Sequence, residues 1–304
     1  MRNTLLVPLD GTPIAEAGLS WATGAARKSG ATLHLLSVKE PGVDDAALVA
    51  TVSYLDLHVE RLRAQGLEAH AEVKLGKPAA RILQEARYAD IAVLTSGTTR
   101  WIVSPVLDEI LLKMTTPVVL VRGDRNEWAS ASNFERILLS VSQSNYSSEA
   151  IPLAQRFAMM FEAEIILHHN VSPACAPASP EDSPFASVTT SRTEVDLSQA
   201  EEYVERVASD FRARGLNVRP VVSAGEPAQQ IVSVGREYGA GLIAMATRGR
   251  ERLESRIAGS VANVVLETTP IPCLLIRTGA PAPAGESKGH AGTAVADAVP
   301  DSAV

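Results

Sequence analysis

The stretch from Leu242 to Val265, LIAMATRGRERLESRIAGSVANVV, decides the fold that this sequence predicts. It begins with an apolar run, Leu242–Ala246, which is typical of a buried strand. A polar loop containing Gly249 follows, and an apolar-periodic segment typical of a helix begins at Gly259-Ser260. Strand–loop–helix units of this kind build parallel α/β sheets.

The glycines and charges of this stretch favour a phosphate ligand. Glycine lets the backbone approach a ligand closely, and a helix N-terminus presents free N–H groups and a positive partial charge. The alternative is an ordinary strand–loop–helix in which Ser260 caps the helix and the arginines face solvent. RNA phosphates are less favoured, because Glu251 and Glu254 are interleaved with the four arginines, Arg248, Arg250, Arg252 and Arg256.

The first part of the chain alternates strand and helix signals. Its first strand, Leu5–Leu9, is followed by a helix that begins at Thr12-Pro13, a capping residue with proline at the first helical position. Helical patterns then separate four further apolar strand signals, at Thr32–Val38, Ala69–Leu75, Ile91–Leu94 and Val118–Val121. This alternation predicts a parallel, doubly wound sheet.

The same pattern then begins again at Arg136–Val141. The run RARGL from Arg212 repeats RAQGL from Arg63, and GEPAQQI from Gly225 repeats GKPAARI from Gly76 at the same offset. Self-similarity at a fixed offset indicates an internal repeat. The two halves are therefore predicted to be copies of one fold.

These copies define the predicted domain organisation. The first domain covers residues 1–124, a polar linker covers 125–133, and the second domain covers 134–278. Ser172–Thr193 is rich in Pro, Ser and Ala and is expected to be a mobile excursion from the second domain. Residues 279–304 contain few large apolar side chains and are expected to form a disordered tail.

Limited proteolysis tests this domain map. The first cuts are expected within Ser172–Thr193 and after Gly279, because these segments have little apolar surface to bury. Mass spectrometry of the early fragments locates the cuts. Early cleavage inside Leu5–Val38 would contradict the map.

Each half resembles a domain of the universal stress protein family. That family carries Gly-x2-Gly-x9-Gly-(Ser/Thr) between its fourth strand and its last helix, and here every element fits except the first glycine, which is Ala246. The resemblance implies an α/β fold that is adenine-nucleotide alpha-hydrolase-like, with two tandem doubly wound five-stranded parallel-sheet domains. It also implies ATP, with Mg²⁺, as a ligand, because many members bind ATP.

Carried over residue by residue, the nucleotide motif is divided between the halves. The second half keeps most of the glycine loop, but Ser142 stands in the place of Asp10 and Asn170 in that of Val38. A serine hydroxyl accepts a hydrogen bond from an adenine amino group more weakly than a carboxylate does. The nucleotide-binding residues that the resemblance implies for this half are Ser142, Met245, Arg248, Gly249, Gly259, Ser260 and Val261.

The first half keeps only the adenine side of the motif, as a residual site. Pro8 and Asp10 lie in VPLDGT, and Val38 ends the second strand. The glycine loop is lost, because the run TSGT from Thr95 and the later Pro105 stand where its glycines belong. Pro105 lacks an amide donor where a phosphate would need one, so nucleotide is expected in the second half.

Composition restricts the classes of function. A net charge of −7 without a long basic run argues against nucleic acid as a partner. No apolar stretch reaches the roughly 20 residues of a membrane span, and the N-terminus lacks a signal-peptide pattern. With Cys175 and Cys273 as its only cysteines, the protein is expected in the cytoplasm. His168 and His169 point to opposite faces of a strand, so we expect a structural or surface role and no metal site.

The function expected from these features is that of a non-catalytic, cytoplasmic stress-response protein whose second domain binds ATP or another adenine nucleotide. One alternative is a nucleotide-independent module that binds an unidentified protein partner, and another is a slow ATP hydrolase. The Ser-Gly-Gly-x-Asp-Ser loop of related ATP-using pyrophosphatase-type enzymes follows neither first strand, which argues against adenylating chemistry.

The closing strands of the two halves predict how the halves meet. Val118–Val121 and Cys273–Ile276 are wholly apolar and are expected at the sheet edges. An open apolar edge invites pairing with another strand, and one-domain universal stress proteins typically dimerise through this edge. We therefore predict an intrachain pseudo-dimer in which these strands pair antiparallel about a pseudo-twofold axis. The sequence leaves a further homodimer open.

Overall fold

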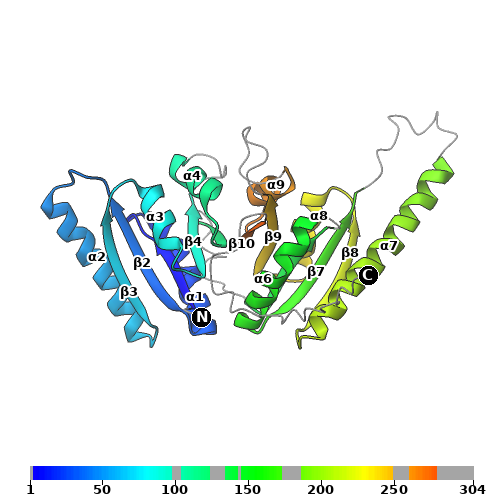
Figure 1. The fold of residues 1–304 in the computed structure, drawn as a ribbon, viewed down its shortest axis with the longest axis horizontal. Coiled ribbons are helices and arrows are strands. Elements are labelled where there is room, and N and C mark those ends of the chain that lie inside the picture. The colour runs from blue at the N-terminus through cyan, green and yellow to red at the C-terminus, as the bar shows by residue number, and fades with distance from the viewer. Residues whose placement is uncertain are drawn as a thin grey trace, which may run out of the picture.

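The computed structural model describes residues 3–97, 104–123, 134–142, 145–172, 186–248 and 260–278. For residues 145–149, 186–196, 248 and 260 it describes the backbone alone. Within these ranges, strands and helices alternate along both halves of the chain, as the sequence predicts (Figure 1).

The elements of the first half follow one another in βα units. They are β1 (Thr4–Pro8), α1 (Pro13–Ser29), β2 (Thr32–Lys39), α2 (Asp45–Ala64), β3 (Ala69–Leu75), α3 (Pro78–Ala86), β4 (Ile91–Ser96), α4 (Pro105–Lys113) and β5 (Val118–Arg122). Helix α1 begins as its sequence signals indicate. The Thr12 side chain accepts a hydrogen bond from the Ala15 N–H, and Pro13 occupies the first turn.

The second half repeats this order. Its elements are β6 (Arg136–Val141), α6 (Asn145–Phe161), β7 (Glu164–Val171), α7 (Ala186–Arg212), β8 (Val218–Ala224), α8 (Pro227–Glu237), β9 (Leu242–Arg248), α9 (Ser260–Thr268) and β10 (Cys273–Thr278). Figure 1 shows the two halves side by side, with β10 and β9 near the middle of the molecule.

All these strands form one sheet of ten, in the order β3-β2-β1-β4-β5-β10-β9-β6-β7-β8. Neighbours within each half are parallel, whereas β5 and β10 pair antiparallel. Val119 pairs with Leu274, which occupies the equivalent place in the second half. A pseudo-twofold axis therefore passes between these two residues, and the predicted pairing of the closing strands is confirmed. The flanking pairs are Cys273 with Leu120 and Leu275 with Val118.

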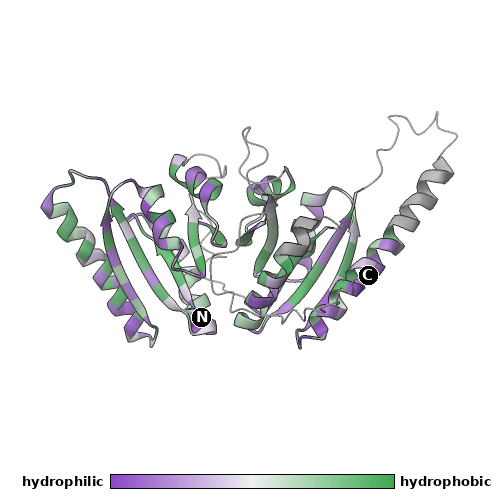
Figure 2. Ribbon diagram, viewed as in Figure 1, coloured by the Kyte–Doolittle hydropathy of each residue, from purple (hydrophilic) through white to green (hydrophobic). Residues whose placement is uncertain are grey.

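Two apolar clusters, one on each face of the sheet, run through both halves. Alternate strand residues such as Leu5 and Val7 face α1, α2, α6 and α7, while Leu6 faces α3, α4, α8 and α9. Figure 2 shows many hydrophobic residues along the strands and both hydrophobic and hydrophilic residues along the helices. Because each cluster includes residues of both halves, the molecule has a shared core rather than two separate ones.

Aromatic side chains fill the junction on the α1 and α6 face. The Trp21 ring of α1 meets the Phe134 ring edge-on at 5.3 Å between centroids, and Phe134 stacks on Phe161 of α6 at 4.9 Å. Nearby, Arg156 forms an ion pair with Asp90, which also accepts a hydrogen bond from the Thr4 N–H. Side chains of the two halves thus contact each other directly as well as through the sheet.

Two sequence-based predictions about element bounds were wrong. The predicted mobile segment Ser172–Thr193 overlaps α7, which begins at Ala186. All its prolines precede Ala186, so nothing in the later residues interrupts a helix. Strand β9 continues through Arg248 instead of ending with the apolar run at Ala246, because Arg248 pairs with Thr278 of β10.

The residues of the proposed linker from 125 to 133, those from 173 to 185, and the tail from 279 onwards lie outside the described part of the chain. The first protease cuts are therefore expected only before Ala186 within the Ser172–Thr193 segment, and after Thr278. Among the residues that the structure describes, no helix combines the length and apolarity that a membrane crossing requires.

Candidate functional site

Each half has a point where the strand order reverses. Strand β1 lies between β2 and β4, and β6 lies between β7 and β9. In open α/β sheets, ligands bind at the carboxyl ends of the strands at such a point. Several of the sequence-predicted site residues that the structure describes lie at or near these two places, so we consider each half in turn.

Asp10 of the first half takes part in a local turn. It follows β1, is exposed, and its Oδ1 accepts hydrogen bonds from the Thr12 N–H at 2.9 Å and from the Thr12 hydroxyl at 2.6 Å. The same hydroxyl oxygen caps α1, so the carboxylate supports the start of that helix. Of the other residual-site residues, Pro8 is the last residue of β1. Val38 packs against the apolar cluster on the sheet face that α3 and α4 cover.

Ile14 covers the place in the first half where a phosphate would be expected. A Cβ added to Gly97 after β4 would lie 2.5 Å from Ile14 Cδ1, and one added to Gly123 after β5 would lie 2.8 Å from Ile14 Cγ2. The isoleucine side chain therefore rests directly on both glycines. Helix α4 begins with Pro105, which lacks an amide N–H. Among the described residues, this end of the first half therefore presents an apolar side chain, and its last helix lacks an amide donor at Pro105.

In the second half, polar side chains lie in register at the corresponding place. Met245 of β9 lies beside Ser140 of β6, and Ser140 lies beside His168 of β7. Ser142 follows β6, is exposed, and its carbonyl oxygen accepts a hydrogen bond from the Tyr203 hydroxyl at 2.9 Å. In the equivalent row of the first half, Pro8 lies beside Leu36, and neither side chain has a polar group.

A hydrogen-bonded network extends this row toward the end of β7. His168 Nε2 lies 2.8 Å from Ser223 Oγ, and that hydroxyl donates to Asn170 Oδ1 at 3.1 Å. The Asn170 amide donates to the Gly225 carbonyl at 3.0 Å. Burial lowers the pKa of His168 to about 4, so its ring is neutral at pH 7.

Both histidines of β7 are therefore structural rather than surface residues. His169 Nδ1 lies 2.9 Å from the Val141 carbonyl oxygen, and its ring meets Tyr203. Within the described ranges, no group of three or more His, Cys, Asp or Glu side chains could hold a metal ion.

The glycine loop of the second half is described at its two ends. Arg248 is the last residue of β9, and Ser260 is the first residue of α9. Met245 belongs to the apolar cluster on the α8 and α9 face of the sheet, and Val261 of α9 is partly buried against that cluster. Gly249 and Gly259 lie outside the described residues.

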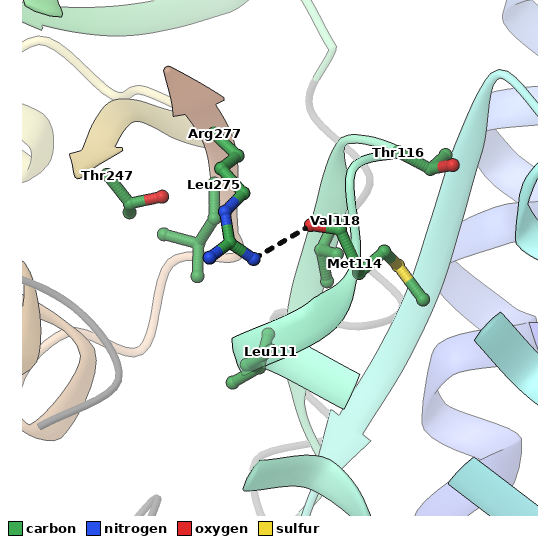
Figure 3. Close-up of a pocket in the computed structure, with 7 residues that line it drawn as sticks. All are labelled: Leu111, Met114, Thr116, Val118, Thr247, Leu275 and Arg277. Atoms are coloured by element: carbon green, nitrogen blue, oxygen red, sulfur yellow. Dashed lines mark hydrogen bonds between the residues drawn. The ribbon is translucent and has the colours of Figure 1, made fainter. Parts of the chain in front are cut away.

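Two hollows lie near these positions. A shallow one of about 310 Å³ is lined by residues of α7 alone, among them Tyr203, and it adjoins Ser142 through the hydroxyl contact. A crevice of about 20 Å³ lies at the junction beside Leu275 and Arg277 (Figure 3). It has room for about one water molecule, and therefore excludes a nucleotide.

The fold thus defines a class: a tandem pair of doubly wound α/β domains, each with a point where its strand order reverses. The sequence model of the universal stress protein family matches residues 1–122 and 133–277. The chain belongs to the universal stress protein family.

Individual relatives agree with this assignment. The universal stress protein YxiE of Bacillus subtilis is 25% identical over 159 residues, which are 47% of this chain and 99% of YxiE. A universal stress protein of Methanocaldococcus jannaschii is 25% identical over 144 residues, 47% of this chain and 82% of that protein. The crystal structure of a universal stress protein from Archaeoglobus fulgidus covers 92% of this chain and 100% of its own, with 19% identity and a TM-score of 0.67. The tandem fold of this chain is thus shared with a solved structure.

Sequence reasoning missed three residues that shape this region. Ile14 lies against two glycines because of the way α1 packs on the ends of β4 and β5, and no local sequence pattern predicts this packing. Arg122 and Arg277 could have been identified as candidate residues from the sequence. Each directly follows the four apolar residues of a closing strand, in VVLVR and CLLIR, at equivalent places in the repeat.

Proposed function

We propose that this protein binds ATP, or another adenine nucleotide, at the switch point of its second half. The observation that supports this most directly is the contrast between the two last helices. Helix α9 begins with Ser260, directly after Gly259, whereas α4 begins with Pro105. The first turn of α9 therefore has a backbone N–H that α4 lacks, and helix N-termini with free amides favour phosphate.

The proposed ligand would extend from this helix across the ends of β9, β6 and β7. Its phosphates would face Gly249, Gly259 and Ser260, with Arg248 as a nearby cation and Mg²⁺ as counter-ion. Its base would lie toward Met245 and the Ser142 side, where a hydroxyl can accept from an adenine amino group.

We further propose a non-catalytic role in the stress response, in the cytoplasm. Family membership supports the general role. The low cysteine content supports the location. His168 would be a weak general base, because burial lowers its pKa and its Nε2 is already hydrogen-bonded to Ser223. A slow ATP hydrolase would instead release phosphate measurably over hours.

A nucleotide-independent interaction module is the second candidate. One observation favours it: the Asn170 amide is already bonded to Gly225 and Ser223, and Ser142 replaces the adenine-side carboxylate. Base recognition in the second half would therefore be weaker than in a site with an aspartate there. In this case the nucleotide motif would be a remnant, and the protein would act through a protein partner.

Nucleotide binding is tested by mass spectrometry of co-purified nucleotide and by equilibrium dialysis with labelled ATP. Gly259→Asp is expected to abolish ATP binding, because it adds a side chain and a negative charge beside the phosphates. Asp10→Ala is the control and should leave the affinity nearly unchanged, since the first half lacks the loop. Thermal melting of both variants confirms that they fold.

Two results would contradict the proposal. If the wild-type protein binds no ATP, the interaction module is the better description. If binding survives Gly259→Asp but is lost in Asp10→Ala, the site lies in the first half.

A further inference from the structure

Two arginines at the ends of the closing strands reach across the junction between the halves. Arg277 Nη1, near the end of β10, donates to the Leu112 carbonyl at 2.5 Å. It also donates to the Met114 carbonyl at 3.3 Å (Figure 3). Arg122 Nη1, at the end of β5, donates to the Glu267 carbonyl at 3.2 Å. Each arginine therefore contacts the last helix of the other half.

These contacts obey the pseudo-twofold symmetry. Arg122 and Arg277 occupy equivalent positions, as do their acceptors Leu112 and Glu267. Both helices also end in the same way, with the N–H groups of Met114 and Thr269 donating to the carbonyls of Ile110 and Val265 at 2.8 Å. The C-terminus of α4 is thus held by the second half, and that of α9 by the first half.

Such a contact stabilises a helix end. The last carbonyl groups of a helix have no intrahelical donor and carry a negative partial charge, which a guanidinium satisfies. Arg122 is only 4% exposed, so water screens this attraction little. Helix α9 spans nine residues, and a helix of that length depends on tertiary contacts for its stability.

We propose that Arg122 is a positioning residue for the nucleotide site of the second half. It fixes the C-terminal end of α9, and the N-terminal end of the same helix presents the amides of the proposed phosphate site. The two ends lie only about 13 Å apart at roughly 1.5 Å per residue, so a shift at one end moves the other. The nucleotide affinity of the second half thereby depends on a side chain of the first.

The chain offers a matched control, because Arg277 makes the same kind of contact with α4. Arg122→Met is expected to weaken ATP binding about tenfold in equilibrium dialysis, whereas Arg277→Met leaves it unchanged. Arg122→Lys should restore part of the affinity, since lysine keeps the positive charge and a donor but loses the fork geometry. Hydrogen exchange should accelerate in the α9 amides of Arg122→Met and in the α4 amides of Arg277→Met.

The inference rests on the proposed function, and the two can fail separately. A wild-type protein without ATP affinity contradicts the proposed function, and α9 exchange in Arg122→Met then decides whether Arg122 positions the helix. Equal losses of ATP affinity in both methionine variants would indicate general destabilisation and overturn the inference. Unchanged α9 exchange in Arg122→Met would overturn it as well.

Discussion

Leu120→Lys is expected to loosen both halves of the protein together. Leu120 is 0% exposed in β5, faces Cys273 of β10, and belongs to the apolar cluster that runs through both halves. A buried ammonium group without a partner costs about 3–5 kcal/mol, a large part of the stability of a typical protein. The variant also opens the antiparallel pair and exposes an apolar strand edge, which promotes aggregation.

This effect is measured by the hydrogen-exchange rates of the backbone amides, determined separately for the two halves. Leu120→Lys should accelerate exchange in β9 and β10 as well as in β4 and β5, and Leu275→Lys should do the same from the other side. Leu36→Lys is the matched control, because Leu36 is equally buried but lies in β2, away from the junction. If Leu120→Lys leaves the second half as protected as Leu36→Lys does, the halves do not depend on this pairing.

Trp21→Ala is the second substitution with a large expected effect. Trp21 is 1% exposed, and removing such a side chain costs about 3–5 kcal/mol through lost burial and the cavity left behind. Because its ring contacts Phe134 of the second half, part of that loss should come from the junction itself. We expect a single denaturation transition that shifts to a lower denaturant concentration.

A double-mutant cycle with Phe134→Ala isolates the junction contribution. Aromatic pairs of this geometry couple by about 0.5–1.5 kcal/mol beyond their burial, so the double variant should lose less stability than the sum of the single ones. Leu55→Ala is a suitable comparison, because Leu55 is also buried but belongs to α2. Strict additivity of Trp21→Ala and Phe134→Ala would show that the rings do not couple the halves.

Much of the fold could be predicted from local patterns. Alternation of apolar runs with helical periodicity gave the βα order, and the repeated runs at Gly76 and Gly225 revealed the duplication. The pairing of β5 with β10 followed from a physical rule, that an apolar strand edge needs a partner, together with the resemblance to one-domain family members that dimerise through this edge. The order of strands and helices depends on residues close in sequence. The pairing of β5 with β10 depends on the need of each apolar edge strand for a partner strand.

The details of the site were harder to predict, because they depend on side chains from distant elements. Strand β7 runs beyond its apolar stretch through His168 and Asn170, whose side chains are linked by hydrogen bonds to Ser223 of β8. The covering of the first-half site by Ile14 depends on the approach of α1 to the ends of β4 and β5. Sequence periodicity contains neither kind of information.

The symmetric register at Val119 and Leu274 has a consequence for how the two halves can diverge. In a homodimer built on such an axis, every substitution appears twice, and the association weakens on dilution. A covalent link keeps the second strand at a high effective concentration, so the pairing here should not depend on protein concentration. Each half can then change independently: one can bury its ligand position under an isoleucine while the other keeps its glycines, and the shared sheet still forms.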